Sequence, residues 1–168
     1  SSAASDVYKR QSYHPFFGGS PANIAMNVKA LGGRSALVAA VGKDRMGEFL
    51  KETINQRGLT DGIIQENKAS TSMVLVNKTT GTPIPIFYRG ADYQLDYTNE
   101  LKELASESKI LHFSSWPISQ EHSRQTIESL IEQAKAEGTL ISFDPNYHPA
   151  LWQEGHDGID YIKELIKH

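Results

Sequence analysis

The residues best suited to chemistry lie in one short polar turn, Gly18-Gly19-Ser20-Pro21-Ala22-Asn23. Two adjacent glycines let backbone N–H groups approach a ligand, because no Cβ stands in the way. Pro21 suits the first turn of a helix, and Asn23 adds an amide that both donates and accepts hydrogen bonds. The turn therefore predicts a site at a helix N-terminus for a ligand rich in hydroxyl groups.

Alternatives to this site stay open on the residues of the turn alone. A glycine pair before a helix is more often a plain turn than a ligand site. The spacing is neither G-x-G-x-x-G nor a glycine followed by Lys-Ser/Thr. A dinucleotide-binding domain is disfavoured, because the third glycine and the acidic residue about 20 positions further on are missing. By itself, the turn indicates only a contact to a small molecule.

The elements that position these residues follow from the pattern of apolar positions. Apolar runs predict strands over 36–41, 110–114 and 140–143. From residue 110 onward, strand alternates with helix, which indicates a parallel sheet with crossover helices. Ligands of such sheets bind beyond the carboxyl ends of the strands, where 144–148 would lie. Two further strands, over 71–77 and 84–89, interrupt this rhythm and predict a small β flap, or lid.

The expected helices each have a start signal or an apolar face. The helix after the glycine turn is expected to pack through Ile24, Val28 and Leu31 and to end at Gly32. Three further helices are expected to begin at the capping residues Asp44, Thr98 and Ser119. The last helix is expected to begin near Asp157. The last helix is expected to turn Ile159, Ile162 and Ile166 inward, and Gly138 is expected to end the one before it.

Composition excludes several classes of function. Lys and Arg total 17 against 20 Asp and Glu, a net charge of −3 that offers no general attraction to nucleic acid or to an anionic membrane. No apolar run approaches the ~20 residues of a membrane helix. Without cysteine there are no disulfides or thiolate metal sites, which is compatible with a cytoplasmic location. The histidines lack metal-ligand spacing, so no metal site is expected.

Several stretches taken together resemble the ribokinase-like, or pfkB-type, carbohydrate kinases. The resemblance covers roughly residues 16–152, and the motifs are most similar to those of fructokinases and 2-keto-3-deoxygluconate kinases. It implies an α/β fold, a partial three-layer parallel-sheet domain with the β lid. The stretches that carry it are Gly18-Gly19-x-x-Ala22-Asn23, Leu31-Gly32, Ala39-Ala40-Val41-Gly42-Lys43-Asp44 with Gly47, Phe87-Tyr88-Arg89-Gly90-Ala91-Asp92, Ile110-Leu111-His112-Phe113-Ser114, and Asp144-Pro145-Asn146-Tyr147 with Leu151-Trp152.

The resemblance also implies a role for individual residues. Substrate-binding positions would be Gly18, Gly19, Asn23, Phe87, Arg89 and Trp116. Nucleotide-binding positions would be Asn146, Tyr147 and His148. The lid arginine, Arg89, would grip the carboxylate of a sugar acid or donate to neutral hydroxyls, and Asp92 would shape the turn after the strand. For Trp116, a place in the core and a place in the pocket wall are equally expected. His148 replaces the usual arginine, so a phosphate contact there would weaken as the pH rises.

The resemblance implies an enzyme that transfers the γ-phosphoryl of ATP, bound with Mg²⁺, to a hydroxyl of a sugar or keto sugar acid. The catalytic Asp of the family lies in a Gly-Ala-Gly-Asp turn, which this sequence lacks. Because that turn is missing, we expect 12–168 to be the N-terminal part of the kinase, inactive by itself. Residues 1–11 begin with a small polar run and lack the apolar core of a signal peptide, and we expect them to be a non-native leader. A homodimer through the lid and, alternatively, a non-catalytic sugar-binding or regulatory module stay open.

Overall fold

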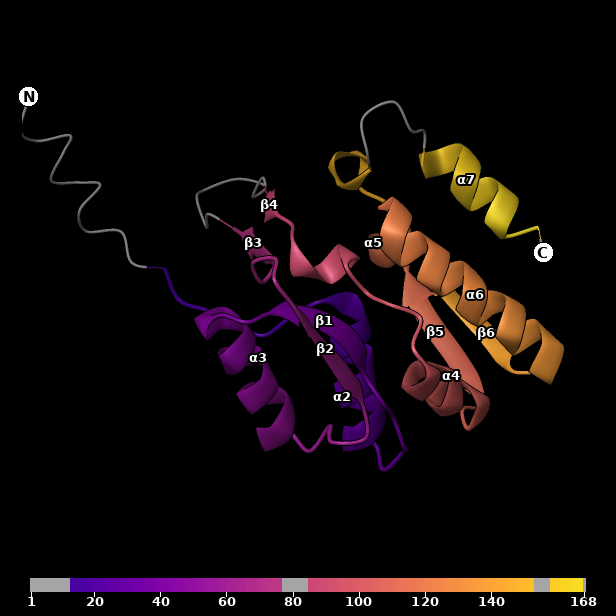
Figure 1. Ribbon diagram of the computed structural model, residues 1–168, viewed down its shortest axis with the longest axis horizontal. Helices are drawn as coiled ribbons and strands as arrows, with labels where there is room; N and C mark the ends of the chain where they lie inside the picture. Colours follow the sequence, from indigo (N-terminus) through magenta and orange to yellow (C-terminus); the bar gives the residue numbers. More distant parts are fainter. Residues whose placement is uncertain (1–12, 77–84, 153–157, 168) are drawn as a thin grey trace, which may run out of the picture.

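The computed structural model describes residues 13–76, 85–152 and 158–167, which fold into α/β structure (Figure 1). The strands are β1 Val38–Gly42, β2 Ile63–Asn67, β3 Met73–Leu75, β4 Ile86–Tyr88, β5 Ile110–Ser114 and β6 Leu140–Asp144. The α-helices are α2 Ser20–Ala30, α3 Arg45–Gln56, α4 Asn99–Ser106, α5 Ser115–Ile118, α6 Glu121–Glu137 and α7 Gly158–Leu165. Single 3₁₀ turns are η1 Ala91–Tyr93 and η2 Pro149–Leu151. The expected leader, 1–11, lies outside the described residues.

Parallel strand pairs form the body of the molecule. β1 pairs with β2 in a register that sets Val38 opposite Ile63, and β5 pairs with β6 with Ile110 opposite Leu140. A helix crosses over within each pair, α3 in the first and α6 in the second, as the alternation of strand and helix from residue 110 predicts for the second pair. In Figure 1, α2 and α3 lie beside the β1–β2 pair, whereas α4 and α6 lie beside β5–β6.

Strand β2 was not predicted from the sequence. Only its first two residues, Ile63 and Ile64, are apolar, and Gln65, Glu66 and Asn67 follow them. Such a short run gives neither the alternation nor the length of a typical strand signal. The strand forms because its backbone completes the parallel ladder along β1. Tertiary pairing therefore decided this element.

The lid is a short antiparallel ribbon made by β3 and β4. Met73 lies opposite Tyr88, and Leu75 lies opposite Ile86. Alternation along β4 turns Phe87 to one face of the ribbon and both of its neighbours to the other face. The expected outer strand ends, Asn77 and Ile84, lie outside the described residues. The ribbon lies at the same end of the molecule as α5 (Figure 1), and its Phe87 ring contacts the Trp116 ring of that helix.

Most expected helix boundaries are confirmed, and one cap was wrong. Asp44 accepts a hydrogen bond from the Gly47 N–H at 2.9 Å, and Thr98 accepts one from the Leu101 N–H at 3.2 Å. α6 ends at Gly138, whose φ of +73° is the left-handed conformation that favours glycine. Ser119, however, does not cap α6: Gln120 is the N-cap, and the Ser119 hydroxyl donates instead to the Trp116 carbonyl at 2.6 Å.

The buried faces of the first and last helices also differ from expectation. The small side chains Ala22 and Ala25 are buried in α2, whereas Ile24, Val28 and Leu31 are exposed, Leu31 to 88%. The small side chains on the buried face let α2 pack closely against the neighbouring elements. In α7, Ile162 is buried and Ile159 is exposed, and Ile166, directly after the helix, is exposed as well. In each of these two helices, the helical spacing identifies an apolar face, but it does not show whether another part of the protein covers that face.

Separate clusters of buried side chains hold these elements together. One cluster packs α4, α6 and α7 against β5 and consists of Ile63, Leu101, Phe113, Ile118, Ile127, Leu130, Ile131, Leu151, Trp152 and Ile162. The other packs α2 and α3 and consists of Ala22, Ala25, Leu37, Ile54 and Leu59. Among the helices of 13–76, 85–152 and 158–167, none has the length and apolar character of a membrane span.

Candidate functional site

The glycine turn opens α2, as predicted. Gly19 is the N-cap with φ +108° and ψ 135°, a conformation that favours glycine. The Asn23 N–H donates to the Gly19 carbonyl at 2.9 Å, and the Asn23 side chain is exposed. A Cβ built on Gly18 or Gly19 meets nothing within 4 Å, so both glycines border open space. The turn thus leaves its two glycines and one side-chain amide open to solvent.

A hydrogen bond joins this turn to the end of β6. The Ser20 hydroxyl donates to Asp144 Oδ2 at 3.0 Å. One residue further along the chain, the Pro145 carbonyl accepts a hydrogen bond from the Ser115 hydroxyl at the start of α5. The turn, β6 and α5 therefore meet at the carboxyl ends of β5 and β6, the edge where open α/β sheets bind ligands.

Phe87 places the lid over this edge. Its ring lies edge-on to the Trp116 ring at 5.6 Å and to the His148 ring at 4.9 Å between centroids. The aromatic edge-to-face geometry is a favourable one. One lid side chain thus contacts a residue expected at the sugar and a residue expected at the nucleotide.

Arg89 follows β4 and is almost completely engaged with the protein itself. Its Nε and Nη2 donate to Asp92 Oδ2, and Nη2 also donates to the Trp116 carbonyl at 3.1 Å. Nη1 donates to the Ser119 hydroxyl at 2.6 Å and to the Leu151 carbonyl at 3.2 Å. The guanidinium carbon lies 4.6 Å from the centre of the Trp116 ring. The side chain is only 9% exposed.

Asp92 gathers contacts from both strands of the lid, which the sequence interpretation underrated. Its Oδ2 accepts from the Trp116 indole N–H at 2.6 Å in addition to Arg89. Its Oδ1 accepts from the Ser72 hydroxyl, next to β3, and from the Gly90 N–H at 3.2 Å. The signal in the sequence was the Arg-x-x-Asp spacing directly after an expected strand. Asp92 therefore ties the base of the lid to α5.

The segment after β6 carries the residues expected at the nucleotide. Asn146 has φ +22°, a positive value that is uncommon outside glycine. The Tyr147 ring is 37% exposed and lies 6.3 Å from the Trp152 ring. His148 Nδ1 accepts from the Ala150 N–H at 3.2 Å and so caps η2. The backbone after β6 thus turns sharply and presents an amide and a phenol beyond the end of the strand.

Asp44 links the turn after β1 to the lid. Its carboxylate accepts from the Gly47 N–H, from the Thr71 N–H at 2.8 Å and from the Thr71 hydroxyl at 2.7 Å. These bonds, chiefly the one from the Thr71 backbone, hold the pKa of the Asp44 carboxyl below its usual range. A Cβ on Gly42 would lie 2.3 Å from the Ala69 carbonyl, and one on Gly47 would lie 2.1 Å from the Gly42 carbonyl. The Gly42, Asp44 and Gly47 motif therefore positions the chain that enters β3.

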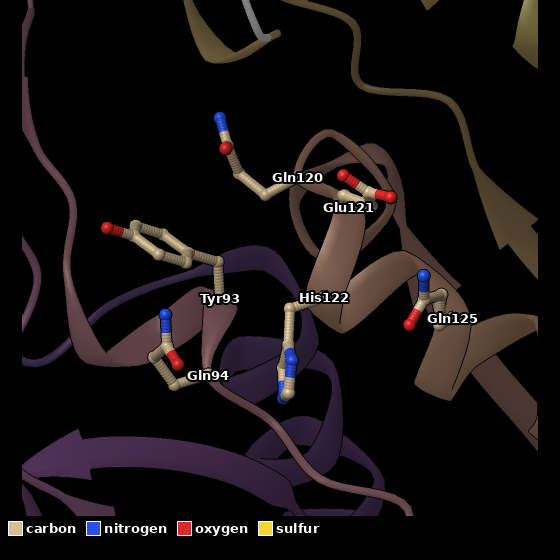
Figure 2. A pocket seen from close by; sticks show the side chains of 6 residues that line it. All are labelled: Tyr93, Gln94, Gln120, Glu121, His122 and Gln125. Carbon is tan, nitrogen blue, oxygen red and sulfur yellow. The ribbon is translucent and has the colours of Figure 1, made fainter.

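A hollow of about 380 Å³ lies between η1 and the start of α6, and none of the expected site residues lines it. Figure 2 shows Tyr93 and Gln94 on one side and the start of α6 on the other; the lining is Tyr93, Gln94, Gln120, Glu121, His122 and Gln125. The Arg89 guanidinium lies 5.8 Å from the centre of the Tyr93 ring, which lines this hollow. Within the described part of the chain, no group of three His, Asp or Glu side chains is arranged to hold a metal.

Comparison with known proteins identifies the family. The family described as pfkB family carbohydrate kinase matches residues 2–168, so the chain belongs to it and the resemblance carried by the motifs is confirmed. The chain is 48% identical over 161 residues to the ATP-dependent 6-phosphofructokinase of Thermoanaerobacterium thermosaccharolyticum, covering 96% of this chain and 50% of that protein. It is 32% identical over 152 residues to the probable fructokinase-5 of Arabidopsis thaliana, covering 88% and 47%.

Solved structures agree with the ribokinase-like fold. The fructokinase of Halothermothrix orenii superposes with a TM-score of 0.86 at 33% identity, over 95% of this chain and 57% of that one. The fructokinase of Xylella fastidiosa with bound ATP gives a TM-score of 0.74 at 29% identity, over 85% and 45%. This chain spans about half the length of the curated relatives it matches.

Proposed function

We propose that this chain is the sugar-binding part of an ATP-dependent carbohydrate kinase. The whole enzyme transfers the γ-phosphoryl group of ATP to a hydroxyl of a monosaccharide or keto sugar acid. Fructose and 2-keto-3-deoxygluconate are the leading acceptors, and fructose 6-phosphate joins them because a 48% identical relative is named a 6-phosphofructokinase. A cytoplasmic location belongs to the same proposal, since ATP is the co-substrate and the sequence holds no cysteine.

The observation that carries this proposal is the meeting of distant motifs at one edge of the sheet. Ser20 bonds to Asp144 at 3.0 Å, and Phe87 contacts both Trp116 and His148. Phosphoryl transfer depends on holding an alcohol in line with the γ-phosphoryl group. A sugar held at the glycine turn would lie next to a nucleotide held after β6, which is the juxtaposition that the reaction requires.

Individual residues receive the following proposed roles. Gly18 and Gly19 offer backbone groups to sugar hydroxyls, and the exposed Asn23 amide donates and accepts there. Phe87 and Trp116 form apolar walls, and Arg89 stands behind them. Asn146, Tyr147 and His148 would contact the nucleotide. Mg²⁺ would arrive on the ATP phosphates, where it neutralises their charge.

The test uses the full-length kinase that carries this chain, with ATP, Mg²⁺ and a panel of acceptors. The panel contains fructose, fructose 6-phosphate, 2-keto-3-deoxygluconate and ribose. ADP formation that depends on one of the sugars supports the proposal, and saturation identifies the acceptor. Sugar binding without ADP formation would instead indicate a non-catalytic sugar-binding module, and no sugar binding at all would overturn the proposal.

We also propose that a second copy of the chain covers the outer face of the lid. Met73, Ile86 and Tyr88 share the face opposite Phe87 and are 47%, 49% and 51% exposed. Apolar side chains gathered on an exposed ribbon are typical of an interface. Light scattering of the full-length protein should give the mass of a dimer, and the substitution Ile86→Lys should give that of a monomer. A wild-type monomer at assay concentrations would contradict the dimer.

A further inference from the structure

The lid arginine has no donor left for a ligand. A guanidinium carries five N–H donors, and each N–H of Arg89 has an acceptor in the protein: Asp92 takes two, and Trp116, Ser119 and Leu151 take one each. A side chain that is 9% exposed is also largely shielded from solvent. An acidic group of a substrate would have to displace the Asp92 carboxylate to reach it.

The acceptors of Arg89 come from the walls of the site rather than from the lid alone. The Trp116 carbonyl belongs to α5, Ser119 precedes α6, and the Leu151 carbonyl ends η2. The Trp116 ring is held twice more, by the stacked guanidinium and by its N–H to Asp92 at 2.6 Å. The pair Arg89 and Asp92 therefore fixes Trp116 and the η2 segment relative to the lid.

We propose that Arg89 is a positioning residue, locked by Asp92, and that this half of the site selects its sugar by hydroxyl groups and not by charge. This inference rests on the proposed function and specifies which part of the acceptor this half of the site recognises, namely its neutral hydroxyl groups. A carboxylate or phosphate on the acceptor is bound by residues other than Arg89. Asp92 is the residue on which this selectivity depends, because its carboxylate pairs with the Arg89 guanidinium at the base of the lid. A buried cation must be paired, and here the pair is internal.

The test compares Arg89→Gln, Asp92→Asn and the double variant in the full-length kinase. The affinities for fructose and for 2-keto-3-deoxygluconate are measured by calorimetry. We expect Arg89→Gln to weaken both by the same factor, within about twofold, since it disturbs the walls and removes no ligand contact. A loss for the acid that exceeds the loss for fructose tenfold would show a direct clamp and overturn the inference.

The emission of Trp116 supplies a readout that does not depend on sugar. With the Trp116→Phe spectrum subtracted, Arg89→Gln and Asp92→Asn should both shift its emission maximum, because each removes a partner of the indole. Arg45→Gln, which breaks the exposed pair with Glu48, serves as the matched control and should leave the spectrum unchanged. Unchanged emission in Arg89→Gln or Asp92→Asn would overturn the positioning role.

The double variant guards against misfolding of the single variants. Asp92→Asn leaves a buried cation without its partner, so its melting temperature should fall furthest, and adding Arg89→Gln should recover part of the loss. A double variant that melts below Asp92→Asn would contradict the internal pair. If the wild type binds no sugar, the proposed function fails, while the emission and melting results still decide whether Arg89 positions Trp116.

Discussion

Ser20 Oγ lies 3.0 Å from Asp144 Oδ2, although 124 positions of sequence separate the two residues. This bond holds the first turn of α2 against the carboxyl end of β6. The start of α2 carries the glycines and Asn23, and the segment after β6 carries Asn146 and His148. The two halves of the proposed site are therefore joined by a contact that neither motif contains by itself.

Removing this bond should loosen the site. We expect Ser20→Ala to cost about 1 kcal/mol in the free energy of unfolding, since the acceptor is charged but partly solvated. Sugar affinity should fall by about fivefold, the equivalent of ~1 kcal/mol. The matched control is Ser35→Ala, because the Ser35 hydroxyl bonds to the Ala25 carbonyl of the same helix at 2.7 Å. Equal loss of sugar affinity in the two variants would refute a specific role for Ser20.

The conformation of Gly19 should be required where that of Gly18 is not. At φ +108° and ψ 135°, Gly19→Ala should cost about 1–3 kcal/mol of stability in urea unfolding, because a Cβ is strained there whatever the space. Gly18 has no positive φ and open space around it, so Gly18→Ala should unfold at nearly the wild-type midpoint. Its effect on sugar affinity then reports contact with the ligand alone. Equal stability of the two variants would argue against a special conformation at Gly19.

The amide of Asn23 should matter for the ligand more than for the fold. Because the side chain is exposed, Asn23→Ala should change the free energy of unfolding by no more than a cap-sized ~1 kcal/mol. Sugar affinity, measured by calorimetry on the full-length kinase, should fall about tenfold, which corresponds to ~1.4 kcal/mol. Asn27→Ala places the same change one turn later on an exposed position and should leave affinity intact. A normal sugar affinity of the Asn23→Ala variant would contradict a ligand contact and would indicate that the glycine turn is only the start of a helix.

Acid should weaken the connection between α3 and the lid. The bonds from Thr71 and Gly47 hold the pKa of Asp44 below its usual range, so the carboxylate binds fewer protons in the folded state than in the unfolded one. Its contribution to stability is therefore present above the unfolded pKa of about 4 and is lost as the pH falls through the folded value. Asp44→Asn should be less stable than wild type at pH 7, and this difference should shrink toward pH 3.

Urea unfolding at several pH values between about 3 and 7 measures this effect. Glu52→Gln, an exposed change on the same helix, controls for the loss of one negative charge. A difference between Asp44→Asn and wild type that is constant with pH would contradict the assignment, because it would then come from the shape of the side chain and not from its charge.

Local patterns predicted most of the fold correctly where a short stretch decides the outcome. Asp44 and Thr98 cap the helices that follow them, and Gly138 ends α6. These features depend on bonds within one turn of the chain, so the sequence carries them. Strand β2 escaped prediction, because its polar residues take part in a ladder supplied by β1.

Predictions failed where the environment of a side chain comes from distant segments. Ser119 has the right type for a cap, yet its hydroxyl is used by Trp116 and Arg89. Val28 and Leu31 have helical spacing, yet Ala22 and Ala25 are the buried residues of α2. Spacing gives the direction of a side chain around the helix axis and not the neighbour that it meets.

The amino-acid sequence by itself determined the family, the alternation of strands and helices, and the polar turns at 18–23 and 144–148. It did so because these features consist of residues that are neighbours along the chain. Only the tertiary structure decided that Ser20 bonds to Asp144 and that the five donors of Arg89 are filled, one of them by Leu151 at a separation of 62 positions. The guanidinium of Arg89 is thus paired and hydrogen-bonded within the protein, because folding brings Asp92 and three separate acceptors to it.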